Sequence, residues 1–158
     1  PNRPKSRGFV KLRSKESKDD PIIQFNYLKE EEDLKQMRES IFIARNIFNQ
    51  PSFESYLGEE ISPGIKNKSI DELNEIIKNN AESAYHPSCS NKMGTDKMSV
   101  VDENTKVYGI NNLRVIDSSI MPDIVSGNLN AATLMIAEKA SSIILNNEEE
   151  VLDVGYYK

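Results

Sequence analysis

Apolar residues recur at steps of three and four between residues 30 and 49. The repeating positions are Leu34, Met37, Ile41, Ala44 and Phe48. This spacing places them on one face of a helix, and the acidic residues at its beginning suit the positive end of the helix dipole. Gln50-Pro51 then ends the pattern, because proline cannot continue a helix. The sequence therefore predicts an amphipathic helix over residues 30–49.

A second helix is predicted to begin after Ser69. The run Ser69-Ile70-Asp71-Glu72 has the spacing of a capping box, in which serine and glutamate side chains each bond a backbone N–H. The apolar residues that follow share one face, and they are Ile70, Leu73, Ile76 and Ile77. Asn79-Asn80 closes this helix.

Two stretches before these helices are typical of strands. Residues 8–13 and 21–27 are separated by a polar, charged turn, so they predict an antiparallel hairpin. Further along, we expect a short strand at residues 106–108 and a buried strand at 112–117 that ends on Asp117. The apolar residues from Ala131 to Leu145 predict a final, buried helix, and a charged tail follows it.

Length and composition narrow the class of protein. The 158 residues suit one domain with a core of its own, and the net charge of -5 gives no basic footprint for nucleic acid. The basic residues between Arg3 and Lys18 are interpreted as a solvated face. A single cysteine, Cys89, excludes an internal disulfide and fits a reducing compartment. Because the chain begins with Pro1, we expect a fragment of a longer polypeptide.

The only histidine, His86, lies in an irregular stretch from Ala84 to Gly94. Histidine is the usual proton-transfer group near neutral pH. Pro87 biases His86 toward an extended backbone, so the stretch reads as a fixed loop that presents one imidazole. The alternative is a histidine whose hydrogen bonds are satisfied in a core.

Two asparagines precede the last predicted helix. Asn130 lies where an N-cap is expected, and a helix N-terminus favours a developing negative charge. Asn128 is on the loop and free to point elsewhere. Alternatively, both asparagines are only turn and cap residues. Asp117 either contacts a ligand or caps the turn at Ser118-Ser119.

Several motifs occur in the order of a known family. They are Arg3-Pro4-Lys5-Ser6-Arg7-Gly8, Phe25-Asn26-Tyr27-Leu28, Glu60-Ile61-Ser62-Pro63-Gly64, Tyr85-His86-Pro87-Ser88-Cys89, Lys92-Met93-Gly94, residues 112–122, Ser126-Gly127-Asn128-Leu129-Asn130 and Met135-Ile136-Ala137-Glu138-Lys139-Ala140. With them, residues 2–146 resemble the C-terminal part of the glucose–methanol–choline family of flavin oxidoreductases. The Gly-Asn-Leu-Asn run narrows the resemblance to members that oxidise choline.

The resemblance implies an α+β fold in which the chain contributes to two different domains. Residues 1–105 would be the later part of a substrate-binding domain, with a partial antiparallel sheet and helices. Residues 106–146 would be a strand–loop–helix segment returning to an FAD-binding α/β domain mostly absent from this chain, and residues 147–158 a charged tail. None of the seven glycines forms the G-x-G-x-x-G turn that binds the FAD pyrophosphate, so the chain alone is expected to be inactive.

The resemblance also implies residue roles. His86 falls on the family's proton acceptor, and Asn128 falls on its partner, which stabilises the substrate oxygen. The residues expected at the FAD are Asp117, Ser118, Asn128, Leu129, Asn130 and Ala131. No metal is expected.

The implied reaction is FAD-dependent oxidation of choline to betaine aldehyde, in glycine betaine synthesis. Tyr85, Tyr56 and Tyr27 are candidates for contacting the quaternary ammonium, and their spacing selects none of them. The expected partners are choline, the missing N-terminal FAD-binding part, and a quinone or other electron acceptor, in the cytoplasm or at the cytoplasmic face of a membrane. The alternatives are a related enzyme for a neutral alcohol and a detached, non-catalytic domain.

Overall fold

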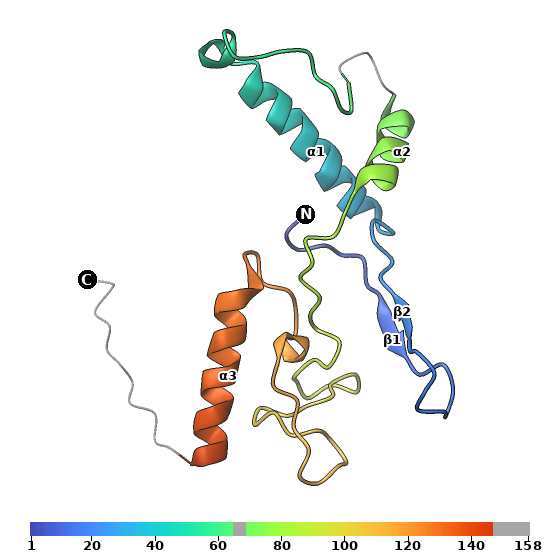
Figure 1. The fold of residues 1–158 in the computed structure, drawn as a ribbon, viewed down its shortest axis with the longest axis vertical. Coiled ribbons are helices and arrows are strands. Elements are labelled where there is room, and N and C mark those ends of the chain that lie inside the picture. The colour runs from blue at the N-terminus through green and yellow to red at the C-terminus, as the bar shows by residue number, and fades with distance from the viewer. Residues whose placement is uncertain (65–68, 147–158) are drawn as a thin grey trace, which may run out of the picture. The chain divides into compact units, whose positions relative to one another are not determined.

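A computed structural model describes residues 1–64 and 69–146 (Figure 1). The chain divides into two compact units after Ala84. The sequence assigns residues 1–105 to a substrate-binding domain and residues 106–146 to an FAD-binding domain. The division into compact units does not test that assignment, which stays a prediction. The predicted tail at 147–158 lies outside the described residues.

A β-hairpin begins the first unit, as the alternating pattern predicts. Strand β1 (Phe9–Lys11) pairs antiparallel with β2 (Ile22–Gln24), and Val10 lies opposite Ile23 (Figure 1). Gly8 precedes β1 where a Cβ would lie 2.1 Å from the Gln24 carbonyl oxygen, so only glycine fits there.

The two predicted amphipathic helices are confirmed, and they form the core of the first unit. Helix α1 (Glu31–Phe48) contacts α2 (Ile70–Asn80). The core residues are Leu34, Leu73 and Ile77, with Leu28, Met37 and Ile41 packed against them. The predicted capping box at the start of α2 is present, since the Glu72 N–H donates to Ser69 Oγ at 3.2 Å and the Ser69 N–H donates to Glu72 Oε2 at 2.8 Å.

Asp33 ties the segment before β1 to the first turn of α1. Its fully buried carboxylate accepts bonds from the Lys5 N–H at 2.7 Å, the Ser6 N–H at 2.8 Å and the Ser6 hydroxyl. Burial alone would raise the pKa of Asp33, but the hydrogen bonds from Ser6 and Lys5 outweigh it and leave the pKa lowered. The carboxylate is therefore a charged structural anchor that the sequence pattern did not reveal.

Arg45 near the end of α1 holds the loop that follows. Its Nε and Nη2 donate to the two carboxylate oxygens of Glu60 at 2.9 and 2.8 Å, and Nη2 also donates to the Gly64 carbonyl at 3.1 Å. The bond from Arg45 lowers the pKa of Glu60. This bidentate ion pair ties the loop, which includes a short 3₁₀ turn η1 (Pro51–Phe53), to α1.

The predicted strands at 106–108 and 112–117 are wrong. Within the described residues, this region pairs only through isolated bridges, including Lys106 with Arg114. The reason is local backbone geometry, because Thr105 (φ 66°) and Asn112 (φ 60°) adopt the left-handed conformation, which interrupts an extended ladder. The second unit contains instead a 3₁₀ turn, η2 (Ser118–Ile120), and the helix α3 (Leu129–Leu145) (Figure 1).

Two expectations about the last helix are also corrected. Helix α3 begins at Leu129, two residues earlier than predicted. It is largely exposed, with only Leu129 and Ala140 buried among the residues described, and Leu134 and Met135 are at least 60% exposed. Among the helices and turns named in the described residues, the short turn η2 is the element that α3 packs against substantially. No helix in the described part of the chain is long and apolar enough to cross a membrane.

We predict that Asp33→Asn lowers the free energy of unfolding of the first unit by about 2–3 kcal/mol at neutral pH. An amide offers one acceptor oxygen where the carboxylate offers two, so a buried N–H or hydroxyl loses its partner. Because the pKa of Asp33 is lowered in the folded state, its contribution is complete above the unfolded value and is lost as the pH falls through the folded value. The difference between the two proteins should therefore shrink in acid.

Denaturant titrations of the chain near pH 7 and near pH 2 measure this difference. Asp20→Asn is the matched control, since Asp20 is exposed and its substitution should change stability little at either pH. A difference for Asp33→Asn that stays constant with pH would contradict the role of the charged carboxylate.

Candidate active site

His86 lies on an irregular loop with left-handed residues on both sides. Tyr85 has φ 58° and Cys89 has φ 69°, so the backbone turns sharply before and after the His86-Pro87 pair. The imidazole is half-buried and has no hydrogen-bond partner in residues 1–64 and 69–146. The structure therefore agrees with the predicted loop and disfavours a histidine satisfied in a core.

Three backbone bonds hold this loop against the turn η2. The N–H groups of alternate residues 89, 91 and 93 donate to the carbonyls of Ser118, Ser119 and Ile120, at 3.3, 2.9 and 2.7 Å. We call these three bonds the loop–turn ladder. They bring the predicted histidine loop and the predicted return segment together within the second unit.

Side chains reinforce the loop–turn ladder at two points. The Ser118 hydroxyl donates to the Pro87 carbonyl at 3.3 Å, and the Asn91 amide donates to the Ser119 hydroxyl at 3.0 Å. Sequence reasoning missed Asn91 and Ser119, because pairing between distant irregular segments leaves no periodic signal.

Asp117 caps η2. Its Oδ1 accepts the Ser119 N–H at 2.7 Å, which is the capping alternative for this residue. The turn is further fixed by Ile120 and Met121, which are 3% and 5% exposed. A contact between Asp117 or Ser118 and FAD stays a prediction.

Asn128, and not Asn130, is the N-cap of α3. Its Oδ1 accepts the Asn130 N–H at 2.9 Å, while the Asn130 side chain is exposed. The expectation that Asn130 caps the helix is therefore wrong. Since only an oxygen can accept this bond, the cap fixes the orientation of the amide and leaves its NH₂ group as a donor that the cap does not use.

The start of α3 has the chemistry expected of a flavin contact. The first N–H groups of a helix lack intrahelical partners and carry partial positive charge, and flavin ring carbonyls are hydrogen-bond acceptors. Asn130 and Ala131 are exposed there, while Leu129 is buried. The Asn128 amide and the exposed Asn130 side chain can supply such donors, so this end of α3 fits FAD, and contact of residues 128–131 with FAD stays a prediction.

The structure brings only part of the predicted site together. The loop–turn ladder joins the His86 loop to η2, and η2 in turn packs against α3. No hydrogen bond joins His86 to Asn128 in the described part of the chain. Of the candidate tyrosines, Tyr85 and Tyr56 are 79% and 87% exposed, and Tyr27 stacks on Phe25.

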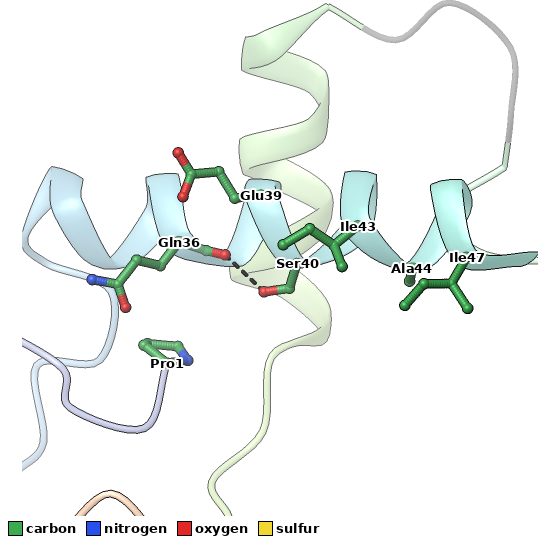
Figure 2. A pocket seen from close by; sticks show the side chains of 7 residues that line it. All are labelled: Pro1, Gln36, Glu39, Ser40, Ile43, Ala44 and Ile47. Carbon is green, nitrogen blue, oxygen red and sulfur yellow. Dashed lines mark hydrogen bonds between the residues drawn. The ribbon is translucent and has the colours of Figure 1, made fainter.

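The first unit has a groove on its surface. It runs along α1 and is lined by Pro1, Gln36, Glu39, Ser40, Ile43, Ala44 and Ile47 (Figure 2). A smaller groove in the second unit lies beside the end of the loop–turn ladder, between Met93 and Tyr108. Neither groove is lined by His86 or Asn128.

Comparison with known proteins identifies the family. Residues 4–137 match the family described as GMC oxidoreductase. The chain therefore belongs to this family of enzymes, for which FAD is the cofactor, and the resemblance seen in the sequence is confirmed.

Three similar proteins show how this chain relates to others in sequence and in fold. It is 51% identical over 139 residues to an oxygen-dependent choline dehydrogenase of Pectobacterium carotovorum subsp. carotovorum (strain PC1), covering 88% of this chain and 25% of that protein. Its fold matches pyridoxine 4-oxidase from Mesorbium loti with a TM-score of 0.84 and 31% identity, over 94% of this chain and 29% of that one. An FAD-dependent oxidoreductase from Chaetomium thermophilum matches with a TM-score of 0.84 and 30% identity, over 91% of this chain and 25% of that one. The chain thus spans about a quarter of the length of these proteins.

We predict that Asn128 and Asn130 differ in their effect on α3. Asn128→Ala should lower stability by about 1 kcal/mol through loss of the cap, whereas Asn128→Asp should not, because a carboxylate oxygen still accepts the Asn130 N–H. Asn130→Ala is the matched control and should change stability little. Thermal melting of the chain measures all three, and equal losses for the two alanine variants would contradict the observed cap.

Proposed function

We propose that the full-length protein to which this chain belongs oxidises choline to betaine aldehyde, a step in glycine betaine synthesis. The proposal is supported by membership in the GMC oxidoreductase family and by 51% identity to oxygen-dependent choline dehydrogenases. The observation that carries the mechanism is a half-buried imidazole, without a partner in the described residues, on a loop fixed by the loop–turn ladder.

His86 is the proton acceptor in this proposal. Oxidation of an alcohol carbon to a carbonyl removes the hydroxyl proton as well as a hydride from carbon. A neutral imidazole accepts that proton, and the resulting imidazolium stabilises alkoxide-like oxygen. A fixed loop suits this role because proton transfer requires the base within hydrogen-bond reach of the hydroxyl.

Asn128 stabilises the same oxygen through its amide NH₂. Its Oδ1 is already bonded to the Asn130 N–H, so the group it can offer a substrate is a donor. A neutral donor aimed at developing negative charge acts in the manner of an oxyanion hole. The helix cap keeps this donor oriented before substrate arrives, which lowers the reorganisation needed during the reaction.

When bound, FAD would supply the two-electron acceptor that the hydride requires, and His86 takes the proton, so the reaction balances. In this proposal residues 128–131 would hold FAD at the start of α3. Turnover also requires a final electron acceptor, for which the printed names of the relatives suggest oxygen, beside the quinone that the family resemblance implies.

Anaerobic mixing of the full-length flavoprotein with alcohols tests the substrate. Choline should bleach the flavin absorbance at low concentration, and 3,3-dimethylbutanol, which replaces the ammonium nitrogen by carbon, is the matched neutral control. Faster reduction by the neutral alcohol would contradict choline as the substrate and favour a related alcohol dehydrogenase.

We predict that His86→Ala lowers the rate of flavin reduction by choline about 10²–10⁴-fold, the usual contribution of a general base. His86→Gln is the control, because an amide can form hydrogen bonds but does not accept a proton. Its flavin should be reduced as slowly as that of His86→Ala. Flavin content and melting temperature should change little, since the imidazole makes no hydrogen bond within the described residues. Stopped-flow absorbance paired with thermal melting measures both effects. Near-normal reduction by either variant would show that His86 is not the proton acceptor.

A further inference from the structure

We propose that Ser118 is the positioning residue for His86, a role that rests on the proposed function of His86 as proton acceptor. The sequence resemblance places Ser118 among the residues expected at the FAD. The structure instead supports a role for its hydroxyl and carbonyl in fixing the backbone that follows His86.

Ser118 bonds the histidine loop through two of its own groups. Its hydroxyl donates to the carbonyl of Pro87 at 3.3 Å, and its carbonyl accepts the N–H of Cys89 at 3.3 Å. These two bonds bracket the segment from Pro87 to Cys89, and Pro87 is the residue directly after His86. They are the first restraints on the backbone C-terminal to the imidazole.

The support on which Ser118 lies is itself fixed. Asp117 caps the start of the turn, and Ile120 and Met121 at its end are buried. The Met121 N–H also donates to the Ser118 carbonyl at 3.3 Å. Ser118 therefore joins the loop to a capped, hydrogen-bonded turn, whereas Tyr85, on the other side of His86 in the sequence, is 79% exposed.

The hydrogen-bonding capacity of the Ser118 hydroxyl favours this role over a contact between that hydroxyl and the cofactor. A hydroxyl has one proton, and in Ser118 that proton is given to the Pro87 carbonyl. The hydroxyl then has only lone pairs to offer, whereas phosphate oxygens and flavin carbonyls need donors. Catalysis is also sensitive to such positioning, because a displacement of about 1 Å at the reacting groups costs about 10²-fold in rate.

Flavin reduction by choline in the full-length enzyme tests the proposal. Ser118→Ala should lower the limiting rate about 10- to 100-fold, with the apparent Kd for choline within about twofold of the unsubstituted enzyme and unchanged flavin content. Ser118→Thr keeps the hydroxyl and should restore most of the rate. Ser141→Ala is the matched control, since it removes an exposed hydroxyl whose bond goes to the Ala137 carbonyl within α3, and it should reduce at the normal rate.

A double variant separates positioning from an independent contribution. If Ser118 acts through His86, Ser118→Ala added to His86→Ala should cause no further loss of rate. The same fold loss in both backgrounds, or loss of flavin from Ser118→Ala, would overturn the proposal and favour a direct contact with the cofactor. Ser118→Cys keeps a weak donor, so its rate of flavin reduction should lie between the rates of the unsubstituted enzyme and Ser118→Ala. It replaces the alanine variant if that variant does not fold.

The outcomes also distinguish this inference from the proposed function. A normal rate for Ser118→Ala beside a slow His86→Ala would overturn the positioning role and leave the proton acceptor in place. A normal rate for His86→Ala would overturn both.

Discussion

The loop–turn ladder is the constraint on which the candidate site depends. It joins two irregular segments that are far apart in the sequence, one carrying His86 and the other leading to Asn128. Each backbone bond contributes about 0.5–1.5 kcal/mol, and three in succession fix the register of one segment against the other. A side chain on an irregular loop gains a defined position in this way without belonging to a helix or strand.

The second unit relies on hydrogen-bonded turns more than on a large apolar core. Asp102 illustrates this, since its Oδ1 accepts the N–H groups of Asn104 at 2.9 Å and Lys106 at 2.8 Å. Arg114 then donates to the Asn104 carbonyl. These bonds satisfy backbone groups that a sheet would otherwise pair. The helix α3 meanwhile keeps much of its apolar surface exposed, in a chain that matches about a quarter of its relatives' length.

The parts of the fold that local patterns specify were predictable from the sequence. The hairpin and the helices α1 and α2 follow from alternation, helical periodicity and a capping box. The strands expected at 106–108 and 112–117 failed because the left-handed residues Thr105 and Asn112 interrupt the pairing, and an apolar run does not reveal them. The start of α3 was misplaced because Asn128 and Asn130 are equally good caps by residue type. In the structure Asn128 is the cap, and Leu129, the first residue of the helix, is buried.

For the site, residue chemistry was enough to single out the only histidine, and the family resemblance supplied the roles of His86 and Asn128. The support of the histidine could not be predicted, because Ser118 and Asn91 act through pairing between distant segments that has no local signal. Asp33 was missed for the same reason, since its partners Lys5 and Ser6 lie far from it in the sequence.

Residue-resolved amide hydrogen exchange in the full-length protein tests the loop–turn ladder most directly. The N–H groups of Cys89, Asn91 and Met93 donate to η2, whereas those of Ser90 and Lys92 have no partner in the described residues. Exchange should therefore alternate, slow at residues 89, 91 and 93 and fast at 90 and 92. Uniformly fast exchange from 89 to 93 would show that the loop is not held against the turn, and would contradict the account of how His86 is positioned.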